Sequence, residues 1–317
     1  MTPDATRIDQ RRATGASPTA AAIAAQAGAK APAENFPVAL RFLPRRYRGH
    51  LAAVYGFARS VDDMGDEAAP QERAALLDEL EADVRRLYRM VSRGPSAGGE
   101  GGGPGDDGSG GGPPRISAVR ALAPAVVTCA IPAQPFHDLI AANRQDQVVS
   151  RYPTFGDLED YCRLSANPVG RIVLHVFGAA TPEREALSDR VCTALQLAEH
   201  WQDVAEDLRA GRIYVPQEDL ERFGCTEGDL AAPRATGRVR ALMAFEERRA
   251  RDLLDTGAPI VGTLHGAARL AVAGYVAGGR AALAAIAASG HDVLRATPRP
   301  GQARVAAEMV RAYATGN

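Results

Sequence analysis

The chain has 317 residues, of which 46% are hydrophobic, so it can bury a sizeable core. Its 37 Lys and Arg residues are matched by 38 Asp and Glu residues, and this balance leaves no global basic field for nucleic acid. Its four cysteines show neither a CxxC pair nor zinc-type spacing, as is typical of reduced thiols in a cytoplasmic protein. The most apolar stretch, residues 259–290, is interrupted by His265, Arg269 and Arg280 and is not expected to span a membrane.

Most of the chain shows helical periodicity. Apolar residues recur three and four positions apart, whereas strand-type alternation of Val, Ile and Thr is nearly absent. We expect helices from about residue 35 to 66 with a break at Pro44, and then over 71–92, 116–129, 135–150, 155–166, 168–180, 184–209, 233–255, 259–289 and 301–315. The sequence therefore predicts an all-α fold, a single-domain helical bundle.

Two segments interrupt this pattern. Residues 1–33 are rich in Ala, Gly and Thr without sustained periodicity, and we expect a disordered N-terminal tail there. Residues 94–114 are rich in Gly, Pro and Ser, and this composition predicts a flexible loop. The expected organisation is a catalytic domain over 34–298 that contains this loop, followed by a C-terminal helix and tail over 299–317.

Two acidic clusters carry the strongest functional signal. Asp62, Asp63 and Asp66 form the first, and Asp203 and Asp207 anchor the second. Carboxylates four residues apart share one face of a helix. Hard oxygen ligands of this kind suit Mg²⁺, which proteins commonly share between one or two carboxylates and substrate phosphates.

Each cluster extends into a polar stripe on an otherwise apolar helix. Tyr55 and Arg59 precede the first cluster at helical spacing, and Gln196 and Glu199 precede the second. A single polar stripe usually just faces water. Two such stripes favour a shared internal Mg²⁺–diphosphate site, with metal ligands predicted at Asp62, Asp63, Asp66, Glu199, Asp203 and Asp207.

The chemistry permitted by such a site is diphosphate ionisation. Mg²⁺ neutralises the leaving group as a Lewis acid, and Arg59 can complete the clamp. The carbocation left behind needs a dry apolar cavity, in which aromatic faces can stabilise it. A dinucleotide site would need GxGxxG after a strand, and that pattern is absent, so NAD(P)H dependence is not indicated.

These motifs resemble those of a known family. The run from Tyr55 to Asp66 (YGFARSVDDMGD) looks like the first aspartate signature of the squalene/phytoene synthase family. The run from Gln196 to Asp207 (QLAEHWQDVAED), followed by GRIYVP, looks like the second. The similarity covers about residues 34–298 outside the Gly-rich loop. It implies the all-α trans-isoprenyl diphosphate synthase fold, Mg²⁺ dependence and an isoprenoid diphosphate substrate in a central cavity.

Further segments resemble one branch of that family most closely. Residues 34–40 (ENFPVAL), 161–171 (YCRLSANPVGR) and 200–204 (HWQDV) are similar to bacterial hydroxysqualene synthases of hopanoid pathways, which ionise presqualene diphosphate and add water. Gln202 stands where condensing members usually have Arg. Fewer cations suit one bound diphosphate better than two. Glu199 stands where most relatives have Asn, and its carboxylate can either add a Mg²⁺ ligand or disturb the charge balance of the cluster.

The resemblance also implies individual roles. Asp62, Asp66, Asp203 and Asp207 are the expected catalytic carboxylates, with Arg59 and Tyr55 beside them. The expected substrate-binding residues are Phe36, Leu40, Ala166, Val169, Gly170, Gln196, Arg212, Tyr214 and Tyr275. Two alternatives remain: a head-to-head condensing synthase acting on farnesyl or geranylgeranyl diphosphate, and a catalytically silent binding or assembly protein. Transient contact with the inner membrane face is a further expectation, and the oligomeric state stays open.

Overall fold

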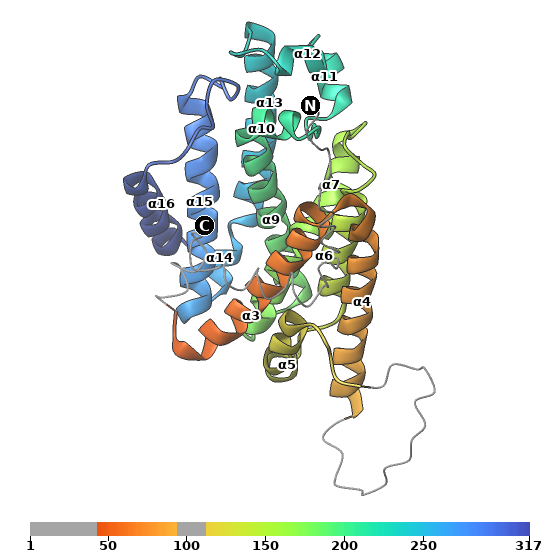
Figure 1. Cartoon of the computed structure of the whole chain (residues 1–317). Coiled ribbons are helices and arrows are strands. Elements are labelled where there is room, and N and C mark those ends of the chain that lie inside the picture. The colour runs from red at the N-terminus through yellow and green to blue at the C-terminus, as the bar shows by residue number, and fades with distance from the viewer. Residues whose placement is uncertain (1–42, 94–111) are drawn as a thin grey trace, which may run out of the picture.

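The computed structural model describes residues 43–93 and 112–317, which form an all-α bundle (Figure 1). The elements are α3 (Arg45–Asp62), the π-helix η2 (Asp63–Glu67), α4 (Pro70–Arg93), α5 (Ser117–Cys129), α6 (Gln134–Gln145), α7 (Phe155–Ser165), α8 (Asn167–Val176), α9 (Pro182–Gln202), α10 (Val204–Arg209), α11 (Gln217–Arg222), α12 (Glu227–Leu230), α13 (Gly237–Gly257), α14 (Ile260–Thr263), α15 (Gly266–Ala288) and α16 (Gln302–Thr315). Across these two ranges there is no β-strand, only an isolated bridge between Arg151 and Ile213. The predicted fold class is confirmed.

Local sequence signals set several helix ends. α3 begins directly after Pro44, whose extended backbone and missing N–H suit the position before a first turn. Thr154 caps α7 through a capping box with Asp157, and Thr181 caps α9 ahead of a proline. Within α4 the apolar side chains that recur at helical spacing are buried: Leu76, Leu77, Leu80, Val84 and Leu87. Each such side chain contributes roughly 1.5–3 kcal/mol by leaving water.

The bundle has two apolar cores that share α8. One core gathers side chains of α3, α4, α5 and α6, and the other gathers those of α7, α9, α13 and α15. Ile172 and Val176 of α8 face the first core, while Leu174 faces the second. α8 therefore lies between the two halves of the molecule.

Two helices expected to be continuous are broken. The segment predicted as 184–209 is interrupted at Asp203, whose backbone (φ −105°, ψ 16°) separates α9 from α10. The segment predicted as 259–289 is interrupted at Leu264 and His265, which are extended, before Gly266 adopts a φ of +55° and α15 begins. Apolar periodicity alone does not detect a break of one or two residues when both halves keep the same buried face.

The apolar helix α15 is a core helix of the bundle. Its 23 residues are long and apolar enough to cross a membrane by length and composition, but half of the most apolar window is buried inside the protein. It packs against α16, α9 and α13. The C-terminal helix expected within 299–317 is α16, and Arg269 of α15 donates a hydrogen bond to the carbonyl of Tyr313 near its end.

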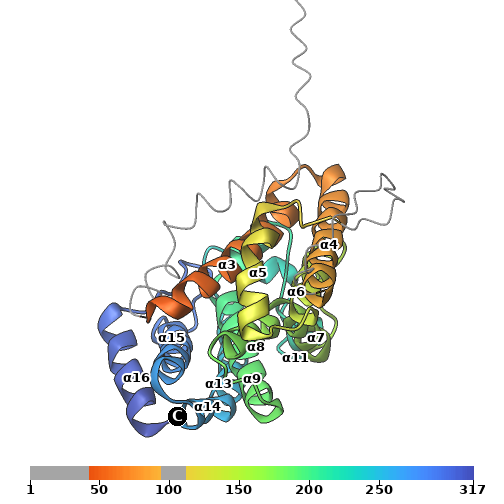
Figure 2. The ribbon, with the colours of Figure 1, turned by 90° about the horizontal axis from the view of Figure 1, so that it is seen from below.

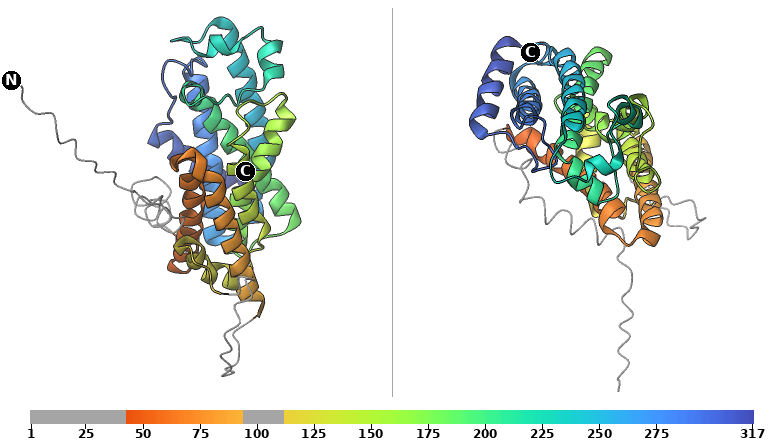
Figure 3. Two further views of the ribbon diagram at one scale, coloured as in Figure 1. Left: turned by 45° about the vertical axis from the view of Figure 1, so that its right-hand side comes forward. Right: turned by 90° about the horizontal axis from the view of Figure 1, so that it is seen from above.

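The molecule has two distinct ends. The short helices α10, α11 and α12 gather at one end, and α5 lies at the other (Figures 1 and 3). α3 starts at the α5 end and runs towards the opposite end over 18 residues, or about 27 Å at 1.5 Å per residue. The expectations for residues 1–33 and for most of the 94–114 segment, and those for Phe36 and Leu40, fall outside the described residues.

Candidate active site

The first acidic cluster lies where α3 turns into a π-helix. Asp62 is the last residue of α3, and Asp66 lies within η2. Single-turn π-helices are rare and often occur at functional sites. Here the wider turn brings Gly65 against Asn143 of α6, whose side-chain amide donates to Asp62 at 3.4 Å. The carboxylates therefore do not share a regular α-helical face as the spacing predicted, although the charge on Asp66 is still felt at Asp62.

Asp62 binds protons more readily than an ordinary aspartate. The surrounding protein atoms remove part of its hydration and raise its pKa to about 6, and the negative charge of Asp66 adds to this effect. The hydrogen bond from Asn143 and the charge of Arg59 oppose the shift. A carboxylate in this condition is stabilised by a cation.

Asp63 and Arg59 face each other. The buried Asp63 carboxylate lies 2.9 Å from Nε of Arg59, and Glu67 lies 3.2 Å from another nitrogen of the same guanidinium. Asp63 was predicted as a metal ligand and Arg59 as a diphosphate clamp. In this conformation each neutralises the other, and their roles towards a metal ion and a diphosphate stay predictions.

The second cluster lies at the break between α9 and α10. Loss of hydration and the nearby charge of Asp203 raise the pKa of Asp207 to about 7. Burial also raises the pKa of Asp203, and burial together with the Asp203 charge raises that of Glu199. Arg299 opposes the shift at Asp203. Four carboxylates, counting Glu206, thus crowd one helix junction.

Arg299 supplies positive charge near the second cluster, where Gln202 had suggested that charge would be lacking. Gln202 was expected to lower the positive charge near the second cluster. Its side-chain amide instead donates to the carbonyl of Pro298, and the next residue, Arg299, places a guanidinium near Asp203. The deficit of cations at this cluster is therefore smaller than the sequence suggested.

Arg212 joins the two clusters. It follows α10 in the chain, and its Nη2 atom lies 2.7 Å from Oδ1 of Asp66 in the first cluster. Burial lowers the pKa of Arg212, but the carboxylates of Asp66 and Asp146 outweigh burial and raise it. Arg212 also lowers the pKa of Asp207. One guanidinium thus serves both clusters.

Tyr214 packs against His200, a residue of α9 near the second cluster. Its ring stacks on the imidazole of His200, with centroids 3.6 Å apart. Burial and the charge of Arg212 lower the pKa of His200 to about 3, so this histidine is neutral at physiological pH. Its Nε2 atom lies 3.2 Å from the side-chain nitrogen of Gln196, a predicted site residue. Tyr214 and Gln196 therefore both contact His200.

The end of α6 adds residues that the sequence argument missed. Asp146 accepts a hydrogen bond from the hydroxyl of Tyr161 at 2.9 Å. Burial raises the pKa of Asp146 to about 6, while the Tyr161 bond and Arg212 oppose the shift. The only signal in the sequence was the polar run from Asn143 to Gln147 at the end of a predicted helix. Its long-range partners cannot be read from local spacing.

The donor set fits Mg²⁺. Asp62, Asp66, Asp203 and Asp207 offer oxygen ligands only, and the raised pKa values of Asp62, Asp203 and Asp207 indicate that these carboxylates lack positive charge. Among the residues that the structure describes, no three acidic, His or Cys side chains converge on a ready-made metal site. Each ion would therefore take one or two carboxylates and complete its shell with ligand oxygens and water.

An apolar cavity of about 210 Å³ lies between α8, α9 and α15. Three predicted substrate-binding residues line it: Val169, Gly170 and Tyr275. The other lining residues are Val173, Leu174, Ser188, Val191, Cys192, Leu195 and Val272. Ala166 is buried just before α8, and Tyr55 is half-buried on α3; neither lines the cavity. Leu195 is eight residues before Asp203, so α9 places the cavity about 12 Å below the second cluster.

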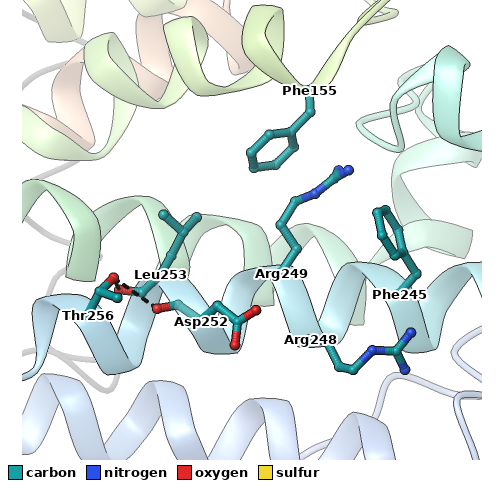
Figure 4. Close-up of a pocket in the computed structure, with 7 residues that line it drawn as sticks. All are labelled: Phe155, Phe245, Arg248, Arg249, Asp252, Leu253 and Thr256. Carbon is teal, nitrogen blue, oxygen red and sulfur yellow. Dashed lines mark hydrogen bonds between the residues drawn. The ribbon is translucent and has the colours of Figure 1, made fainter.

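A wider hollow of about 520 Å³ lies elsewhere, between α7 and α13 (Figure 4). The guanidinium of Arg249 lies over the rings of Phe155 and Phe245, at 4.0 and 4.5 Å from their centroids. The same guanidinium pairs with Asp219 at 2.7 Å. These contacts tie α7, α11 and α13 together, which is a structural role.

A family model for squalene/phytoene synthase matches residues 29–307. The chain belongs to the squalene/phytoene synthase family. It is therefore a member of a family of isoprenoid-synthesis enzymes that act on isoprenoid diphosphates.

Individual relatives place the chain more narrowly. It is 32% identical to the hydroxysqualene synthase of Sinorhizobium fredii over 231 residues, covering 72% of this chain and 70% of the relative. It is 31% identical to that of Zymomonas mobilis over 237 residues, covering 73% and 71%. The crystal structure of squalene synthase HpnC from Alicyclobacillus acidocaldarius is 42% identical, with a TM-score of 0.73 and coverage of 85% and 93%.

Proposed function

We propose that this enzyme ionises presqualene diphosphate and adds water, forming hydroxysqualene and diphosphate. The C–O bond to the diphosphate breaks, the leaving group takes both bonding electrons, and the hydrocarbon cation is captured by water, which then loses a proton. The observation that carries the proposal is the Arg212–Asp66 ion pair, since it brings the two acidic clusters together above the apolar cavity. Similarity to two hydroxysqualene synthases supports the choice of reaction.

The polar residues of the site would bind the metal ion and the diphosphate. Asp62, Asp66, Asp203 and Asp207 would hold Mg²⁺, which neutralises the leaving diphosphate when bound. Arg212 has the geometry to release Asp66 and donate to a diphosphate oxygen, because guanidinium binds both kinds of oxyanion well. The stacking of His200 on Tyr214 holds in place the backbone segment after α10 that carries Arg212.

The apolar cavity would hold hydrocarbon. Its walls are mostly aliphatic, and Ser188, Cys192 and Tyr275 supply its side-chain polar atoms. At about 210 Å³ it is smaller than the roughly 300–1,000 Å³ typical of small-molecule sites, so it would enclose part of a long prenyl chain. Exclusion of water from the aliphatic part of this cavity would leave capture near its few polar groups, among them the Tyr275 hydroxyl.

A product assay tests the proposal. The enzyme would receive Mg²⁺ with presqualene diphosphate, farnesyl diphosphate or geranylgeranyl diphosphate in separate reactions, and extracts would be read by mass spectrometry. Formation of hydroxysqualene from presqualene diphosphate alone is the expected result. An Asp203→Asn/Asp207→Asn variant provides the matched inactive control.

A condensing synthase is the second candidate. The relative at 42% identity is described as a squalene synthase, and Arg299 supplies positive charge near the second cluster. This alternative predicts consumption of farnesyl or geranylgeranyl diphosphate without any presqualene diphosphate. If none of the three substrates reacted while Mg²⁺ and diphosphate still bound, a silent binding role would be favoured.

A further inference from the structure

The end of the molecule opposite the acidic clusters combines an apolar helix face with arginines. α5 is a short apolar helix whose solvent-facing side chains include Ala121, Pro124 and Val127. Val127 is 61% exposed, and Met90 near the end of α4 is 41% exposed. Large apolar side chains exposed on two helices that pack against each other call for an explanation, because a solvated surface gains nothing from them.

Contacts between helices bring this surface together. The hydroxyl of Tyr88 near the end of α4 donates to the carbonyl of Ile131, two residues after α5. Sγ of Cys129 at the end of α5 lies 3.9 Å from the carbonyl of Val176 at the end of α8. The ring of Tyr47 in the first turn of α3 packs on Phe177, with centroids 4.8 Å apart. The end of α5 therefore lies near the ends of α4 and α8, and the beginning of α3 meets the end of α8. α5 lies between α3 and α4 on this side of the molecule (Figure 2).

The charge of these three segments has one sign. Residues 43–58, 84–93 and 112–129 carry nine arginines and no Asp or Glu. Arg85 and Arg86 pair with Glu81 and Asp83 one turn earlier on α4. The exposed arginines at the beginning of α3, the end of α4 and on α5 form what we call the arginine rim: Arg45, Arg46, Arg48, Arg89, Arg93 and Arg120. The acids on other helices near this end include Asp138 in the first half of α6, and Glu183 and Glu185 lie in the first turn of α9.

We propose that this end docks on an anionic lipid bilayer, with the α5 face against the acyl–headgroup boundary and the arginine rim among lipid phosphates. Apolar area combined with surrounding Lys or Arg is the composition of interfacial helices, and each cation near an anionic surface adds to binding. A peptide or a second copy of the chain would need its own acidic ring to match six arginines. A bilayer presents phosphates at every position.

The distribution of charge along α3 fits the same orientation on a bilayer. Its first turn carries Arg45, Arg46 and Arg48, whereas its last residue is Asp62. The two ends of the helix lie about 27 Å apart, several screening lengths at physiological ionic strength. A bilayer under α5 therefore attracts the arginine rim without repelling the acidic clusters.

Vesicle flotation with the full-length protein tests the proposal. The vesicles would be phosphatidylcholine alone, or phosphatidylcholine with one quarter phosphatidylglycerol. We expect binding to the anionic vesicles only, weakened at high salt. An Arg45→Gln/Arg46→Gln/Arg93→Gln variant should bind on the order of 100-fold more weakly, at about fivefold per arginine. Val127→Glu should also weaken binding, and Val127→Trp should strengthen it.

Matched changes on α16 provide the control. Val310 is 71% exposed, and Arg304 and Arg311 are exposed on the same helix. Val310→Glu and Arg304→Gln/Arg311→Gln should leave vesicle binding unchanged. Absence of wild-type binding, or equal losses from the α16 variants, would overturn the proposal. So would a dimer in solution that Val127→Glu converts to a monomer while vesicle binding persists, because the face would then belong to a second copy.

Discussion

Nη2 of Arg212 lies 2.7 Å from Oδ1 of Asp66, although 146 residues separate them in the chain. The pair is half-exposed, with side-chain exposures of 26% and 49%, so it adds only about 0.2–1 kcal/mol to stability. Its importance is positional, because it holds the end of η2 against the segment that follows α10. An anionic ligand that takes Arg212 would leave Asp66 available to a metal ion.

Arg212→Gln should therefore reduce turnover far more than stability. The neutral amide keeps one donor for Asp66 but loses the charge that a diphosphate would need. We expect kcat/KM to fall roughly 100-fold, equivalent to about 2.7 kcal/mol of transition-state stabilisation, while the melting temperature changes little. Steady-state kinetics and thermal denaturation would measure the two effects.

Arg209→Gln serves as the control for that variant. Arg209 is exposed on α10, and its Nε donates only to the carbonyl of Ala205 on the same helix. It should retain wild-type kinetics. Equal activity of the Arg212 and Arg209 variants would exclude a role for Arg212 in diphosphate binding.

Most helices could be predicted from the sequence, because a helix that buries one face has apolar residues three and four positions apart. The start of α3 after Pro44 and the break before Asn167 followed from proline geometry. The π-turn after Asp62 was not predictable in the same way, because a shift of one residue hardly changes the apolar pattern. The turn packs against Asn143, which lies 81 residues from Asp62 in the chain.

In the candidate site, the carboxylates could be predicted from the sequence but their partners could not. The carboxylates could be identified because acids four residues apart are unusual on apolar helices. The partners of those carboxylates could not, since Arg59 pairs with Asp63 and Asp146 accepts from Tyr161 only once the fold is formed. Spacing identifies residues that share a helix face, whereas contacts between helices depend on how the helices pack.

Gly65→Ala tests the packing of the π-turn. A Cβ at position 65 would lie 2.2 Å from Oδ1 of Asn143, so the Asn143 amide must move away from Asp62. We expect a loss of about 1–3 kcal/mol in unfolding free energy from overpacking, together with weaker Mg²⁺ binding. Chemical denaturation and calorimetric titration with Mg²⁺ and diphosphate would report the two effects.

Gly49→Ala is the matched control, since position 49 is exposed on α3 with no atom within 4 Å of an added Cβ. This change should stabilise the helix by roughly 0.5–1 kcal/mol because alanine is the better helix former. If Gly65→Ala were as stable as Gly49→Ala and bound Mg²⁺ normally, the close contact with Asn143 would not matter.

Glu246 should make stability depend on pH. It is fully buried on α13, and burial raises its pKa to about 8 against the opposing charge of Arg249. The folded state therefore favours the protonated form. The stability from this group is fully present below the unfolded pKa of about 4.5 and is lost as pH rises through about 8.

Glu246→Gln is neutral at every pH and should remove this dependence. Its melting temperature relative to wild type should rise progressively between about pH 5 and pH 8. Glu221→Gln on the neighbouring α11, where the side chain is exposed, should follow the wild-type curve. Parallel curves for wild type and Glu246→Gln would show that Glu246 remains ionised when buried.

Tyr275 offers a test of how the cation is captured. Its side chain lines the apolar cavity, burial raises its pKa to about 12, and its hydroxyl therefore keeps its proton at physiological pH. Tyr275 and Ser188 supply the hydroxyl groups of this cavity, and a hydroxyl can hold a water molecule near a carbocation. Tyr275→Phe removes that group and keeps the ring, so folding and substrate affinity should persist. We expect the share of hydroxylated product to fall and hydrocarbon elimination products to rise, as measured by mass spectrometry of extracts.

Val272→Ala in the same wall is the control, because it changes volume without removing a hydroxyl. Unchanged product ratios in Tyr275→Phe would assign water positioning to another group.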